Sequence, residues 1–174
     1  MDRSAYIKRI TRNAIMLALL CAVGMFAIPL GDNIKVSLQL LMVFIIGLTA
    51  YSFIDTLIVT SLYLALGLFM PIYAGFNAGI SPTFGFVISF VVISLPLYFL
   101  NKLKIKNQFI RMGLACLVSL IICYAIGSVF MMLYLNISIE KALLISVVPY
   151  LPFDIAKIII AILVVSLLPK RVVS

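Results

Sequence analysis

Long apolar runs separated by short polar breaks make up the whole chain, and this pattern sets the fold class. Six runs have close to the ~20 residues that a helix needs to cross the hydrocarbon of a bilayer. They cover residues 13–30, 36–53, 56–73, 84–101, 110–134 and 147–168. The pattern predicts an all-α polytopic membrane protein, a compact bundle of six transmembrane helices that forms a single membrane domain over residues 1–174.

The composition supports this class. Hydrophobic residues make up 66% of the 174 residues and charged residues 10%, which is more apolar surface than a soluble domain of this size can bury. The second and third runs are separated so briefly that they must form a tight helical hairpin. The first run is closely followed by further runs, so we expect it to be retained and not removed as a signal peptide.

Basic residues gather beside alternate breaks, which predicts the orientation in the membrane. If the spans alternate, ten of the thirteen basic residues fall on one side and three on the other. The positive-inside rule then places both termini in the cytoplasm. The ten are Arg3, Lys8, Arg9, Arg12, Lys102, Lys104, Lys106, Arg111, Lys170 and Arg171. Because topology explains the net charge of +8, the charge does not indicate a nucleic-acid partner.

Charges inside or beside the last run are the candidate chemistry. Asp154 and Lys157 are three residues apart, so they share one helical face near the external side, where they can pair or hold a polar ligand. A purely structural ion pair is the alternative. Asp55 is expected only to cap the third helix, and Glu140 and Lys141 are interpreted as loop charges.

Two further external segments can contribute to a site. Gln39 enters the second run, where its amide must find a partner. The segment 70–86 is rich in Gly, Pro and small polar residues, and irregular backbone at membrane depth is tolerated only against protein or a wet cavity. We therefore expect it to fold over a pocket, with hydrogen bonds or apolar contacts from Tyr73, Phe76, Asn77, Ser81 and Thr83. A plain connecting loop is the alternative.

A stripe of small residues lies along one face of the first run. Ala14, Ala18 and Ala22 recur every four residues and form a face that a neighbouring helix can approach closely. This face is expected either to bind a partner subunit or to pack against another helix of the same chain.

The sequence lacks the motifs that several classes of function require. The sequence contains no phosphate-binding loop, no paired catalytic carboxylates, no histidine and no metal-ligand spacing for its three cysteines, which we assign to packing. We expect no cofactor and no ATP hydrolysis by this chain, so that another protein drives any transport. Two other classes stay open: a small membrane enzyme with Asp154 as a base, and an accessory membrane scaffold.

Five segments give the chain a family resemblance. They are 14–22 with its three alanines, Ile28-Pro-Leu-Gly…Val-Ser-Leu-Gln39, Gly67-Leu-Phe-Met-Pro71…Ala-Gly75, Ser81-Pro-Thr-Phe-Gly85 and Leu151-Pro-Phe-Asp-Ile-Ala-Lys157. The chain resembles the substrate-binding S-components of energy-coupling-factor vitamin transporters, most of all the biotin-specific BioY family.

This resemblance implies roles for named residues. The alanine face would dock on a coupling transmembrane subunit that joins two ATP-binding subunits. Asn77, Asp154 and Lys157 match positions that hold biotin. On this basis the expected function is high-affinity capture of a carboxylated vitamin, with Lys157 countering the carboxylate and Asn77, Asp154 and Gln39 bonding the polar head.

The third external loop departs from the biotin pattern. It is shorter, it has Phe84 and Phe86 in place of Gly and Tyr, and no arginine follows it closely. An S-component for another carboxylated molecule, such as lipoate, is therefore the alternative within the same class.

Overall fold

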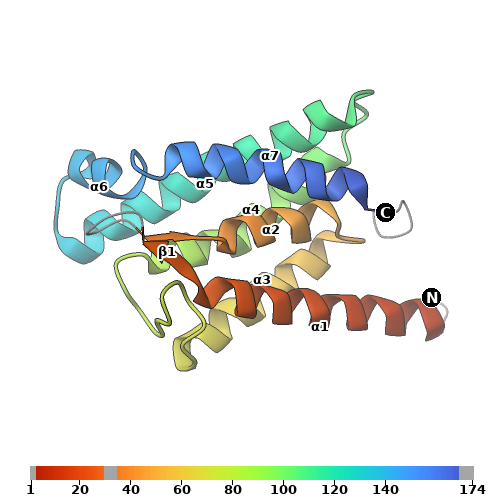
Figure 1. The fold of residues 1–174 in the computed structure, drawn as a ribbon, viewed down its shortest axis with the longest axis horizontal. Coiled ribbons are helices and arrows are strands. Elements are labelled where there is room, and N and C mark those ends of the chain that lie inside the picture. The colour runs from red at the N-terminus through yellow and green to blue at the C-terminus, as the bar shows by residue number, and fades with distance from the viewer. Residues whose placement is uncertain (1–2, 30–34, 169–174) are drawn as a thin grey trace.

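The computed structural model describes residues 3–29 and 35–168, and residues 1–2, 30–34 and 169–174 are left undescribed. Within the described residues the chain forms seven α-helices and one antiparallel two-stranded ribbon (Figure 1). The elements are α1 (Arg3–Met25), β1 (Ala27–Pro29), β2 (Lys35–Ser37), α2 (Gln39–Leu48), α3 (Phe53–Phe69), α4 (Phe84–Asn101), α5 (Gln108–Leu135), α6 (Ile139–Ser146) and α7 (Leu151–Leu167).

Helix α2 lies at the centre of the bundle. It contacts α1, α3, α4 and α7, and most of its residues are buried. Helices α4 and α5 pack against each other along one side. The start of α1 and the end of α7 lie at the same end of the bundle, while the ribbon, α6 and the loop between α3 and α4 lie at the other (Figure 1).

Six of these helices fall on the six predicted apolar runs, and α4 has the predicted bounds. Helix α1 begins at Arg3 instead of residue 13, so the basic segment before the first run is itself helical. Two elements correct the prediction. Residues 139–146 form α6, with Ser138 as its N-cap, where a loop was expected. Residues 27–29 and 35–37 form the short β1–β2 ribbon, where only helices were predicted. The expected charges Lys170 and Arg171 lie outside the described residues.

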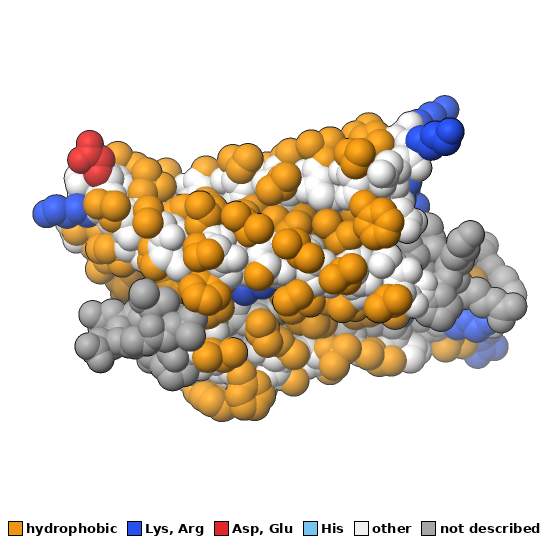
Figure 2. Space-filling model, turned by 45° about the horizontal axis from the view of Figure 1, so that its top comes forward, with side chains coloured by type: hydrophobic (Ala, Val, Ile, Leu, Met, Phe, Trp, Pro, Cys, Tyr) orange, Lys and Arg blue, Asp and Glu red, His pale blue; other side chains and the backbone are white. Residues whose placement is uncertain are grey.

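Length and hydropathy single out fewer spans than the six predicted. Among the described residues, α4 and α5 are each long and apolar enough to cross a membrane, and α6 and α7, bent by 53°, qualify as one broken span. Helices α2 and α3 are apolar but shorter. The surface supports a membrane setting, because apolar side chains cover the middle of the visible face and charged side chains lie mainly at its two ends (Figure 2).

Asp55 ties α1 to α3 at the end of the bundle where α1 begins. It caps α3 as predicted, in a capping box with Ser52. Its carboxylate is 2% exposed and also accepts hydrogen bonds from Arg9 at 2.6 Å and Asn13 at 2.7 Å. The polar start of α1 is therefore held against the bundle by a buried acid, a contact that the sequence pattern did not indicate.

Asp55→Ala is expected to lower the thermal midpoint of the detergent-solubilised protein. It leaves the Arg9 and Asn13 donors without their shared acceptor, a loss of roughly 2–3 kcal/mol, below the range for a fully buried pair because Arg9 is partly exposed. Circular dichroism at the helical band measures the midpoint. The control is Glu140→Ala, which removes an exposed acid at a helix start. Equal midpoints for the two variants would show that Asp55 does not stabilise the packing of α1 against the bundle.

Candidate functional site

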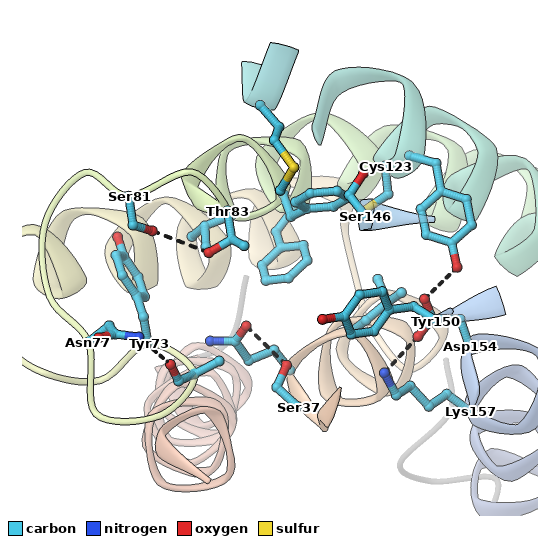
Figure 3. A pocket seen from close by; sticks show the side chains of 18 of the residues that line it. Ser37, Tyr73, Asn77, Ser81, Thr83, Cys123, Ser146, Tyr150, Asp154 and Lys157 are labelled. Atoms are coloured by element: carbon cyan, nitrogen blue, oxygen red, sulfur yellow. Dashed lines mark hydrogen bonds and ion pairs between the residues drawn. The ribbon is translucent and has the colours of Figure 1, made fainter. Parts of the chain in front are cut away.

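A cavity of about 280 Å³ opens at the end of the bundle that holds the ribbon and α6. Its lining comes from β2, from the N-terminal turns of α2, α4 and α7, and from the C-terminal half of α5. The end of α6 and the loop between α3 and α4 complete it. Residues far apart in the sequence therefore meet in one place (Figure 3).

Asp154 and Lys157 form a buried ion pair in the wall of this cavity. Lys157 Nζ donates to Asp154 Oδ1 at 2.6 Å, and the two residues are 6% and 5% exposed. Tyr124 of α5 donates to the other carboxylate oxygen, Oδ2, at 2.6 Å. Pro152 in the first turn of α7 fits the helix start that places Asp154 one turn before Lys157. The predicted pairing is thus observed, and a tyrosine hydroxyl completes it.

The pair keeps unused hydrogen-bonding capacity toward a ligand. An ammonium group has three N–H donors and a carboxylate has about four acceptor positions. The described contacts use one donor of Lys157 and one position on each oxygen of Asp154. Because the two charges balance, the pair presents a donor and an acceptor side by side with no net charge.

The loop between α3 and α4 forms the opposite side of the cavity (Figure 3). Tyr73 and Asn77 pair through their backbones, with N···O distances of 3.0 and 3.3 Å. Gly75 and Phe76, with φ of 75° and 59°, make the turn between them, and Asn77 Nδ2 donates to the Ala74 carbonyl oxygen at 2.8 Å. The segment therefore folds back over the cavity, as the sequence analysis expected.

Hydroxyl groups add to the polarity of this side. The hydroxyls of Ser81 and Thr83 are hydrogen-bonded at 3.2 Å. The ring of Tyr73 is buried, and its hydroxyl donates to the Leu64 carbonyl oxygen at 2.6 Å. A phenol is protonated at physiological pH, so the hydroxyl keeps this bond.

Between the two polar sides lies an apolar wall formed by α4, α5 and α6. Its members are Phe86, Val87, Phe90, Met131 and Ile145. Gly127 makes room for it, because a Cβ at this position would collide with the ring of Phe86. The cavity can therefore enclose a small molecule that has polar groups at both ends and an apolar body.

Seven of the eight predicted site residues line this cavity: Gln39, Tyr73, Asn77, Ser81, Thr83, Asp154 and Lys157. Phe76 does not. It is 61% exposed and packs edge-on against Phe26, with ring centroids 6.0 Å apart. We therefore place it outside the candidate site.

Several lining residues were not predicted from the sequence, including Ser37, Tyr124, Ser146 and Tyr150. Tyr150 extends from the start of α7 toward the middle of the cavity (Figure 3). The one available signal for Tyr124 was a phenol inside an apolar span, since its hydroxyl needs a partner there. Among residues 3–29 and 35–168, no group of three or more His, Cys, Asp or Glu side chains could hold a metal ion.

The alanine stripe lies on the outside of α1. Ala14, Ala18 and Ala22 are all exposed, so they do not pack against another described helix of the chain. Of the two roles that the sequence left open, the internal helix contact is not what the structure shows.

Comparison with known proteins gives three results that agree. A model described as the BioY family matches residues 1–174. A protein of Thermotoga maritima named "Biotin transporter BioY" is 28% identical over 168 residues, which are 94% of this chain and 96% of that protein. A crystal structure at 2.1 Å of the S-component for biotin from an ECF-type ABC transporter superposes with a TM-score of 0.83 at 26% identity, covering 95% of this chain and 92% of the other.

Proposed function

The chain belongs to the BioY family, and from this premise we propose that it is the substrate-binding membrane subunit of a biotin importer. Support comes from a family match over the full length and from similarity in sequence and fold to proteins named for biotin. The observation that carries the proposal is the buried Asp154–Lys157 pair in the wall of a ligand-sized cavity. This membership makes the chain a transport subunit and not an enzyme.

We infer six membrane spans with both termini in the cytoplasm of a bacterial cell. The basic residues that begin α1 and follow α4 support this orientation through the positive-inside rule. The common location of the start of α1 and the end of α7 fits it as well (Figure 1). The cavity, at the opposite end of the bundle, then faces the outside, where a substrate is captured before import.

The ion pair suits the ureido ring of biotin better than its carboxylate. A ligand carboxylate beside Lys157 would also lie beside Asp154, whose like charge repels it. A ureido group carries N–H donors for Asp154 and a carbonyl acceptor for Lys157, and it is neutral. We therefore propose that this pair holds the ureido ring, which replaces the expectation that Lys157 counters the carboxylate.

The rest of the molecule then follows the shape of the cavity. The apolar wall would contact the thioether ring and the aliphatic chain. The carboxylate would lie on the side of the α3–α4 loop, near Asn77, Ser81 and Thr83. Asn77 and Thr83 are exposed, so a carboxylate there keeps contact with water and avoids the desolvation that a buried charge would need.

Binding of biotin analogues tests this orientation. The primary amide of biotin retains the ureido ring. We expect its dissociation constant to stay within roughly tenfold of that of biotin, because the amide loses only one charge-assisted contact near water. Lipoate has the carboxylate and an apolar chain but no ureido group, and we expect no saturable binding in the same range. Competition against radiolabelled biotin measures both. If lipoate bound tightly and the amide of biotin did not bind, the result would instead support a ligand carboxylate beside Lys157 and lipoate as the substrate.

The function itself is tested by titrating biotin into the purified chain without ATP or partner proteins. We expect saturable binding of one biotin per chain, because the cavity is complete within a single chain. Co-purification of a membrane partner with no biotin binding would instead support the scaffold alternative.

We further propose that the exposed alanine face of α1 docks on a coupling transmembrane subunit, which joins two ATP-binding subunits into the importer. Small side chains allow two helices to approach closely, and the resulting van der Waals packing favours their association in a membrane. The lipid bilayer covers the remaining apolar surface, and no nucleic-acid partner is proposed.

A further inference from the structure

Tyr63 does not line the cavity, but it is hydrogen-bonded to Gln39, which does. It lies in α3, is 0% exposed and is absent from the cavity lining. Its hydroxyl donates to the Ile72 carbonyl oxygen at 2.9 Å. Nε2 of Gln39, which lines the cavity, donates to the same hydroxyl at 2.5 Å.

These two bonds leave the Gln39 amide with one orientation. A carbonyl oxygen can only accept, so the single hydroxyl proton of Tyr63 is committed to Ile72. Tyr63 can then only accept from Gln39, which must turn Nε2 toward it. Oε1 of Gln39 consequently points away from Tyr63, and it accepts from Ser37 Oγ, another lining group, at 3.3 Å.

We propose that Tyr63 is a positioning residue for substrate binding, which fixes the Gln39 amide so that its carbonyl oxygen faces the cavity. This inference rests on the proposed function for its ligand. An oriented Oε1 accepts from an N–H or O–H group of the substrate and opposes a bare carboxylate at this position. Tyr63 thus contributes to specificity without touching the substrate.

The surroundings hold the hydroxyl in place. Gly24 of α1 packs against it: a Cβ at this position would lie 2.5 Å from the hydroxyl oxygen and 3.0 Å from the Ile72 carbonyl oxygen. A larger residue at position 24 would therefore displace the Tyr63 hydroxyl or move α1 away from it. Its ring packs edge-on against Tyr73 at 5.6 Å, a contact that phenylalanine retains.

A double-mutant cycle with biotin tests the inference. Tyr63→Phe removes only the hydroxyl, and we expect it to weaken biotin binding about tenfold, while Gln39→Leu weakens binding at least as much. If Tyr63 acts through Gln39, the double variant binds like Gln39→Leu alone. Losses that multiply in the double variant, or unchanged binding in Tyr63→Phe, would overturn the proposal. Tyr98→Phe, which removes a hydroxyl bonded to the Tyr51 carbonyl oxygen away from the cavity, is the matched control and should bind like the wild type.

A second measurement needs no ligand. Gln39 and Gln108 are the two glutamines of the chain, so labelling glutamine side chains with 15N gives two amide signals. We expect the Gln39 amide protons to be protected from exchange in the wild type and exposed to it in Tyr63→Phe, whereas the Gln108 pair at the exposed start of α5 stays unchanged. An unaltered Gln39 signal would overturn the proposal. Altered Gln39 signals in a protein that fails to bind biotin would contradict the proposed function while supporting the orientation of Gln39 by Tyr63.

Discussion

Lys157→Met is expected to weaken biotin binding at least about a hundredfold, since it removes a charged donor to the substrate and leaves a buried carboxylate unpaired. The ammonium group is 2.6 Å from Asp154 Oδ1 in the cavity wall. Without it, Asp154 either stays charged without compensation or takes up a proton, and in both cases the side-by-side donor and acceptor are lost. Equilibrium binding of radiolabelled biotin to the purified variant measures the effect.

Two further variants separate binding from folding. Lys141→Met removes an exposed lysine of α6 and should bind biotin like the wild type. The double variant Asp154→Asn with Lys157→Met removes both charges, so its thermal midpoint should recover from that of Lys157→Met while biotin binding stays lost. Wild-type affinity in Lys157→Met would show that the pair is a structural element without a part in substrate capture.

The second large effect concerns the outer face of α1. Ala18→Leu is expected to reduce biotin uptake by cells at least about tenfold, because a bulky side chain in a close helix contact costs roughly 1–3 kcal/mol. Ala18 is exposed and lies outside the cavity lining. The purified variant should therefore keep the biotin affinity of the wild type. Uptake of labelled biotin and binding in detergent, measured in parallel, give the two values.

The matched control for this prediction is Ala125→Leu. Ala125 is an exposed alanine on α5, away from the alanine stripe of α1. It tests whether a larger side chain on any lipid-facing surface reduces uptake. Equal loss of uptake in Ala125→Leu and Ala18→Leu, or normal uptake in both, would contradict a specific docking role for the α1 face.

Features set by local sequence pattern, such as bounded apolar runs and fixed helical spacings, were predictable from sequence. Helix α4 has the predicted bounds because an apolar run is closed by polar residues on both sides. The Asp154–Lys157 pair was predictable because a spacing of three residues fixes a shared helix face whatever the tertiary structure. The α3–α4 loop was predictable as a cover for a pocket because its composition does not suit exposure to lipid.

Other features depend on contacts between distant segments. Tyr124 lies in a 28-residue helix that is apolar on all sides, so the sequence does not indicate which face meets Asp154. The ribbon strands have three residues each, too few for an alternating pattern. The helical start of α1 was hidden because Arg9 was interpreted as a topological charge, whereas it also bonds to Asp55 across the bundle.

Native mass spectrometry gives the most direct test of the central claim, that the cavity with its buried acid–amine pair is a biotin site. The wild-type chain and the Asp154→Asn, Lys157→Met double variant are incubated with biotin and compared. We expect one biotin per wild-type chain and none on the double variant. Biotin retained equally by both proteins, or absent from the wild type, would contradict it.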